Sequence, residues 1–166
     1  SGAAGDAGPI AGTWMLSPDE GSLGVGPTEF SVEWFKNDAG VTALRACYFD
    51  DTYTFNPDGS FVNGLQDETW IEGWQGGSDA CGAPVAPHDG TAEATWEYDA
   101  EAGTVTLNGQ GAYVGLPKAV NGSELTFPGE APSSVVYNAY PQEDGSLKMT
   151  VEAGDGIWWN YILIRN

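Results

Sequence analysis

Short runs of alternating apolar and polar residues dominate the chain and predict β-strands. In Ser31-Val32-Glu33-Trp34, apolar and polar side chains alternate, which is typical of a strand buried on one face. Comparable runs predict strands at 13–16, 31–34, 48–55, 60–63, 69–74, 92–98, 104–108, 123–127, 133–140, 146–152 and 157–164. Residues 37–46 alone are typical of a helix, with Asn37 or Asp38 as the N-cap.

Turn sequences join several of these runs into hairpins. In Asn56-Pro57-Asp58-Gly59, the proline presets φ and the glycine supplies a positive φ. Two further turns, at 99–103 and 142–145, also end in glycine. The pattern predicts an all-β fold, an antiparallel up-and-down β-barrel of about 8–10 strands, with a β-sandwich or jelly roll as the alternative.

The length of 166 residues fits a single domain. Residues 1–9 are mostly small and are interpreted as a flexible linker or tail, which leaves 10–166 as the barrel domain. Leu, Ile, Val and Phe are scarce, but the chain has seven tryptophans and seven tyrosines. Each aromatic side chain buries roughly 150–250 Å², so a folded, aromatic-rich core is expected.

The charge balance excludes several partner classes. The chain has 24 acidic and 5 basic residues, a net charge of −19. The basic residues are scattered: Lys36, Arg45, Lys118, Lys148 and Arg165. Nucleic acids and anionic membrane surfaces attract clusters of Lys and Arg, so neither is an expected partner, and phosphorylated substrates are disfavoured.

The two cysteines, Cys47 and Cys81, predict a disulfide if the protein is secreted; two buried free thiols are the alternative. The bond would close a loop of about 34 residues, which stabilises the fold by roughly 3–4 kcal/mol in the chain-entropy treatment. High acidity and low lysine content also suit a secreted or cell-surface protein.

The most suggestive chemistry lies in Trp70-Ile71-Glu72-Gly73-Trp74-Gln75. On a strand, Trp70, Glu72 and Trp74 would share one face at spacings of about 6–7 Å. Indole rings stack on the C–H faces of sugars while carboxylate and amide groups bond hydroxyls, as at a ligand site; alternatively, both tryptophans belong to the core. The candidate ligand-binding residues are Trp70, Glu72, Trp74, Gln75, His88, Asp89 and Trp158.

Two weaker constellations involve carboxylates. Glu97, Asp99 and Glu101 fit the Glu-x-Asp-x-Glu pattern of family-16 glycoside hydrolases, in which retention requires carboxyls about 5–5.5 Å apart; the alternative is an acidic turn. No cofactor is expected; the alternative is Ca²⁺, because hard oxygen ligands occur at Asp50, Asp51, Asn56 and Asp58.

The order of landmarks resembles that of small bacterial lipocalin-like barrels. The resemblance is carried by Gly12-Thr13-Trp14, by residues 53–61, by Trp96-Glu97-Tyr98 leading to Leu107, and by Trp159-Asn160-Tyr161-Ile162-Leu163. It implies that the opening Gly-x-Trp packs across the base of the barrel.

Three other stretches resemble accessory modules of secreted marine Bacteroidetes proteins that handle polysaccharides, often beside family-16 glycoside hydrolases. They are residues 45–51, 70–76 and 81–90. The resemblance implies a glycan-related context and attachment to other domains. We therefore expect a non-catalytic carbohydrate-binding module for a polysaccharide such as a β-glucan. The alternatives are a lipocalin-like binder of a small apolar ligand, a glycoside hydrolase, or a structural spacer.

Overall fold

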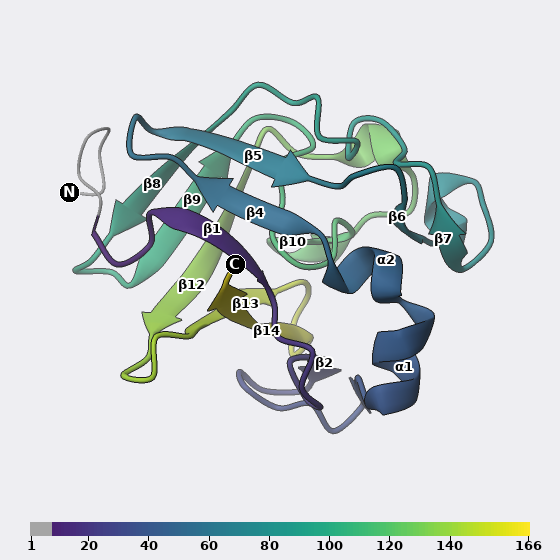
Figure 1. Cartoon of the computed structure of the whole chain (residues 1–166), viewed down its shortest axis with the longest axis horizontal. Helices are drawn as coiled ribbons and strands as arrows, with labels where there is room; N and C mark the ends of the chain where they lie inside the picture. Colours follow the sequence, from purple (N-terminus) through teal and green to yellow (C-terminus); the bar gives the residue numbers. More distant parts are fainter. Residues whose placement is uncertain (1–7) are drawn as a thin grey trace.

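Eight antiparallel strands close into an up-and-down β-barrel, as the sequence predicts (Figure 1). The computed structural model describes residues 8–166, so most of the predicted tail, 1–9, lies outside the described residues. Strand β1 pairs with both β4 and β14, and this double pairing closes the barrel. In barrel order the strands are β1 (Gly12–Leu16), β4 (Thr52–Phe55), β5 (Ser60–Gly64), β8 (Ala94–Asp99), β9 (Thr104–Asn108), β12 (Ser134–Pro141), β13 (Leu147–Glu152) and β14 (Trp158–Arg165).

Side-chain carboxylates fix the predicted hairpin turns. Asp58 accepts hydrogen bonds from the backbone N–H and hydroxyl of Ser60, at 2.9 and 2.7 Å. Asp144 accepts the same pair from Ser146, at 2.9 and 2.6 Å. These local bonds favour the turns between β4 and β5 and between β12 and β13. They explain why these two hairpins were readable from the sequence.

Two short strands extend the sheet beyond the barrel, and here the prediction of a strand at 31–34 is wrong. Strand β2 (Leu23–Gly26) pairs with β14, and β3 (Phe35–Lys36) pairs with β2. Residues 27–34 form a loop, which we call the outer loop. The outer loop folds back against β2. A Cβ atom at Gly24 or Gly26 would overlap Val32 or Ser31 of this loop, so glycine is needed at both positions. The glycines that permit this approach also weaken the strand signal of β2.

Two short helices follow, where one helix and a long strand were predicted. Helix α1 (Ala39–Leu44) begins as expected at Asp38, whose side chain accepts from the N–H of Val41 at 2.9 Å. Helix α2 (Ala46–Phe49) occupies the start of the predicted 48–55 strand, so that strand begins only at Thr52.

The disulfide between Cys47 and Cys81 is present and confirms the predicted pairing. It joins α2 to β7 (Ala80–Gly82), a short strand between the predicted strands at 69–74 and 92–98. Strand β7 pairs with β6 (Thr69–Ile71), so the helices and this small hairpin lie together at one end of the barrel (Figure 1).

A buried segment at residues 112–116 closes the barrel interior. The N–H of Val114 donates to the hydroxyl oxygen of Tyr137 at 3.0 Å, and the N–H of Leu116 donates to that of Tyr161 at 3.2 Å. Two tyrosines of the barrel wall thus bond the backbone of this segment, which satisfies buried N–H groups. The elements that follow are β10 (Ala119–Val120), β11 (Ser123–Glu124) and the 3₁₀ helix η2 (Pro128–Glu130), so only the start of the predicted 123–127 strand forms.

Aromatic side chains fill the remaining interior. If the barrel held a small apolar ligand, an open cavity would be lined by Trp14, Phe55, Phe61 and Tyr161. None of these side chains is more than 2% exposed. The ring of Phe55 lies 5.0 Å from that of Phe61 and 5.5 Å from that of Trp96. This close packing weighs against an interior ligand, because side chains fill small barrels of this kind. Among residues 8–166, no helix is both long and apolar enough to cross a bilayer.

Candidate ligand-binding site

The predicted face of Trp70, Glu72 and Trp74 does not form. Strand β6 ends at Ile71, and the 3₁₀ helix η1 (Gly73–Gln75) follows. The side chains of Glu72 and Gln75 cap this turn reciprocally, which ends the strand. Trp70 is buried beneath the guanidinium of Arg45, whose carbon lies 4.5 Å from the ring centroid. The strand-face prediction was wrong because a capping box overrode the alternation of apolar and polar residues.

Glu72 and Trp74 instead join a polar cluster at the end of the barrel. The indole N–H of Trp74 donates to Glu72 at 3.2 Å, and that of Trp159 donates to Glu124 at 2.8 Å. The ammonium of Lys118 lies 3.9 Å from both carboxylates. These groups bond one another, so their polar atoms are largely engaged within the fold.

The other predicted binding residues are dispersed. The buried His88 stacks edge-on against Trp74 at 5.4 Å, and burial lowers its pKa to about 4, so the imidazole is neutral at pH 7. Asp89 accepts from the N–H and hydroxyl of Thr91, at 3.2 and 2.6 Å, and thereby fixes its own turn. Trp158 is half-buried on the opposite face of β14 from the buried Trp159. Sequence reasoning thus selected Trp158, whereas its neighbour belongs to the barrel-end cluster.

The Glu97, Asp99 and Glu101 carboxylates lie on an exposed hairpin. One Asp99 oxygen accepts the backbone N–H groups of Glu101 and Ala102, both at 3.0 Å. The acidic motif therefore builds the turn between β8 and β9, which is the alternative that the sequence left open.

Two of the residues considered for calcium, Asp51 and Asp58, bond other groups of the fold. Asp51 is fully buried and accepts from the hydroxyl of Thr69 at 2.5 Å, and burial raises its pKa to about 8. Asp58 bonds Ser60 as described above. Across residues 8–166, no group of three or more His, Cys, Asp or Glu side chains is placed to hold a metal ion.

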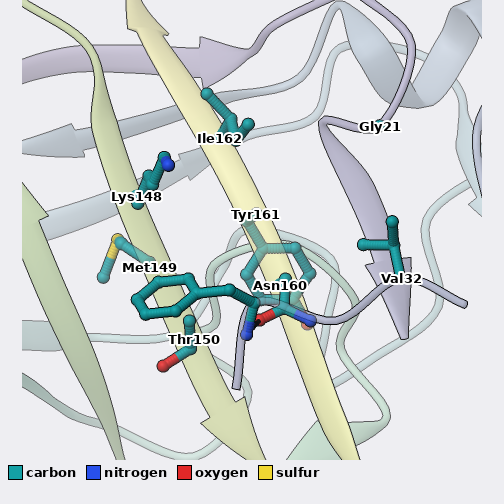
Figure 2. A pocket seen from close by; sticks show the side chains of 9 residues that line it. Gly21, Val32, Lys148, Met149, Thr150, Asn160, Tyr161 and Ile162 are labelled. Carbon is teal, nitrogen blue, oxygen red and sulfur yellow. Dashed lines mark hydrogen bonds between the residues drawn. The ribbon is translucent and has the colours of Figure 1, made fainter. Parts of the chain in front are cut away.

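A pocket of about 100 Å³ lies on the outer wall of the barrel, between the outer loop and strands β13 and β14 (Figure 2). Its lining residues are Gly21, Phe30, Val32, Lys148, Met149, Thr150, Asn160, Tyr161 and Ile162. The outward-facing residues of β13 and β14 alternate with core residues, so Thr150 and Asn160 face the loop while Met149 and Tyr161 face the interior.

Glu29 anchors the outer loop to this wall. One of its carboxylate oxygens accepts hydrogen bonds from Tyr140 at 2.7 Å, Thr150 at 2.7 Å and Asn138 at 3.1 Å. All three donors stand on β12 and β13. Charge-assisted bonds of this kind are among the stronger ones in proteins, so the loop is held in one position.

Phe30, the next residue, is held in an unfavourable conformation with its ring displayed. Its φ is 71°, in the left-handed region that bulky residues rarely adopt. Its N–H donates to Asn160 at 2.7 Å, and its side chain is 50% exposed. The ring lies 5.2 Å from the ring of Tyr140 and 5.7 Å from the ammonium of Lys148. The surrounding hydrogen bonds thus hold the backbone of Phe30 in a strained conformation, with its aromatic ring exposed beside the pocket.

Trp34 lies on the same loop and is 55% exposed, whereas the other six tryptophans are buried or half-buried. It borders a shallow hollow formed by residues 31–36, and Val32 lines both this hollow and the pocket. The outer loop therefore presents two large aromatic side chains to solvent.

Sequence reasoning missed this site. None of Glu29, Phe30, Trp34, Lys148 and Asn160 was selected as a binding residue, and 31–34 was interpreted as a strand. The available signal was the spacing of Gly24, Gly26 and Pro27, which argues against a long strand and for a loop.

Comparison of the chain with known protein families, with curated proteins and with solved structures found no match. Fold and site define a closed antiparallel β-barrel that carries an aromatic-rimmed pocket on its outer wall.

Proposed function

We propose that this protein is a non-catalytic carbohydrate-binding domain whose ligand lies on the outer loop and in the adjoining pocket. The observation that carries the proposal is the geometry of Phe30. A strained residue costs about 1–3 kcal/mol and persists where the surroundings over-determine it, which occurs most often at functional sites. Here the strained residue is Phe30, whose aromatic ring is exposed and lies beside the pocket.

The surroundings of Phe30 suit a sugar. Ligand sites combine apolar surface with a few placed polar groups, and this pocket combines Phe30 with Lys148, Thr150 and Asn160. Trp34 supplies a second exposed ring on the same loop. The net charge of −19 favours a neutral saccharide over a polyanion.

The protein's setting is proposed to be extracellular. Disulfides persist mainly in oxidising compartments, and the Cys47–Cys81 bond joins two segments of this fold. A secreted glycan-binding module, attached to other domains that handle polysaccharides, fits this feature and the resemblance noted in the sequence.

Isothermal titration calorimetry against soluble polysaccharides tests the proposal, beginning with laminarin and mixed-linkage β-glucan and extending to xylan, mannan and chitin oligosaccharides. Phe30→Ala removes the displayed ring. Phe127→Ala is the matched control, because Phe127 is 55% exposed and lies outside the pocket lining.

We expect saturable binding of at least one glycan, weakened about tenfold or more by Phe30→Ala and unchanged by Phe127→Ala. If none of these glycans binds, the proposed carbohydrate-binding function is wrong. Binding that survives Phe30→Ala would keep the function and remove this site, and the barrel-end cluster of Trp74 and Trp159 would then be the next to test.

A further inference from the structure

We propose that the pocket recognises an acyl substituent, such as an N-acetyl or O-acetyl group, on a sugar whose ring packs against Phe30. This inference rests on the proposed carbohydrate-binding function and names the substrate class of the same site.

The size of the pocket sets the first limit. Its volume is about 100 Å³, whereas an apolar cavity that admits benzene measures roughly 150 Å³. A pyranose ring with its hydroxyls is larger than benzene, so a whole sugar does not enter. A substituent of three heavy atoms does fit, while the ring itself remains outside against the exposed aromatic surface.

The polar groups of the pocket set the second limit. The carbonyl oxygen of Asn160 accepts from Phe30, and its amide nitrogen donates to Ser31 at 2.7 Å and to Trp158 at 3.1 Å. The hydroxyl of Thr150 donates to Glu29 at 2.7 Å. Both side chains therefore already use their donors within the fold.

Lys148 is the remaining side-chain donor. In the part of the chain that the structure describes, its ammonium has no ion-pair partner. It stands beside the ring of Phe30 at the pocket. Because an ammonium only donates, the ligand must offer an acceptor oxygen at this point.

The rest of the lining is apolar. Val32 and Ile162 contribute hydrocarbon surface, which suits a methyl group. An acetyl group combines a methyl with a carbonyl acceptor. The methyl matches the apolar walls of the pocket, and the carbonyl oxygen accepts from the ammonium of Lys148. A hydroxymethyl group offers an acceptor but no methyl, and it would leave the apolar wall uncovered.

A carboxylate is a poorer match than a neutral acyl group. Lys148 is the cross-strand partner of Tyr140, whose hydroxyl is bonded to the Glu29 carboxylate at 2.7 Å. This nearby negative charge offsets the ammonium, and the net charge of −19 disfavours anions over the whole surface. The ligand's acceptor is therefore neutral.

Calorimetry with matched oligosaccharides tests the inference. Chitotriose carries an N-acetyl group on each sugar, and cellotriose carries a hydroxyl at the same positions. Acetylated xylo-oligosaccharides, before and after alkaline deacetylation, provide the same comparison for O-acetyl groups. Lys148→Met removes the donor but keeps the aliphatic stem. Lys118→Met is the control, because Lys118 pairs with Glu72 and Glu124 at the barrel end and lies outside the pocket and the outer loop.

We expect at least one acylated ligand to bind about tenfold or more tightly than its unacylated match. Lys148→Met should abolish most of that preference, and Lys118→Met should not change it. Equal affinities for acylated and unacylated ligands, with binding still dependent on Phe30, would overturn the acyl inference and leave the carbohydrate-binding function standing. Absence of binding to all of these sugars and polysaccharides would overturn both.

Discussion

The backbone N–H of Phe30 donates to the side-chain oxygen of Asn160 across a sequence separation of 130 residues, at 2.7 Å. Asn160 stands on the closing strand of the barrel, so the wall itself fixes the conformation of the outer loop. The same asparagine donates to the carbonyl of Ser31. Asn160 thus fixes the backbone at Phe30 and Ser31, next to the exposed ring.

Glycine at position 30 should give a more stable protein than alanine. Both substitutions remove the ring, but only glycine adopts a φ of 71° at little cost. We expect the free energy of unfolding, measured by urea denaturation, to be about 1 kcal/mol higher for Phe30→Gly than for Phe30→Ala. At Phe127, where φ is −156°, the glycine variant should be no more stable than the alanine variant. Equal stabilities at position 30 would mean that the backbone there is not strained.

Glu29→Gln should loosen the outer loop. One Glu29 oxygen accepts three hydrogen bonds, from Asn138, Tyr140 and Thr150. A neutral amide oxygen accepts weaker hydrogen bonds than a carboxylate oxygen, so we expect a loss of roughly 1–2 kcal/mol in the free energy of unfolding. Amide hydrogen exchange at residues 27–34 should accelerate, while exchange in β8 and β9 should not. Unchanged protection of the loop would contradict an anchoring role for Glu29.

Asp51→Asn should change how stability depends on pH. Burial raises the pKa of Asp51 to about 8, against 3.8 in the unfolded chain. The folded protein therefore keeps a proton that the unfolded chain releases, and this contribution is complete below pH 3.8 and is lost as pH rises through 8. Relative to the wild type, Asp51→Asn should gain stability progressively between pH 4 and 8, by at most about 1.4 kcal/mol per pH unit. Urea denaturation at several pH values measures this, and a difference that is independent of pH would refute it.

Removal of the disulfide should destabilise the barrel end without unfolding the hairpins. The bond closes a separation of 34 residues between Cys47 and Cys81. The double substitution of both cysteines by serine should cost roughly 3–4 kcal/mol, measured by denaturant unfolding. Protection from hydrogen exchange should fall first in α2, β6 and β7, since the bond joins α2 to β7. A uniform loss of protection over all strands would show that this end is not a separate unit.

The hairpins of the barrel were predictable because their determinants are local. Residues 92–98 and 104–108 alternate in register with β8 and β9, and Asp99 bonds the turn between them. The disulfide was predicted as well, although from cysteine count and expected compartment rather than from geometry.

The site was not predictable in the same way. The strand expected at 31–34 is a loop, because Glu29 and Phe30 gain hydrogen bonds from strands more than a hundred residues away. At 70–74 the alternation suggested a binding face, but the Glu72–Gln75 capping box ended the strand and Trp70 was buried under Arg45. In both segments, hydrogen bonds that the alternation of apolar and polar residues does not encode determined the backbone conformation.

The sequence by itself determined an all-β chain with tight turns, an aromatic core and a strongly negative surface, because alternation, turn chemistry and charge act over a few residues or over the chain as a whole. Only the tertiary structure decided which aromatic rings are displayed. Trp70 and Trp159 are buried while Phe30 and Trp34 are exposed, and no local property of those residues separates the two pairs. Their difference arises when the barrel closes and Asn160 meets the backbone of Phe30, since exposure depends on which distant segments come to lie together.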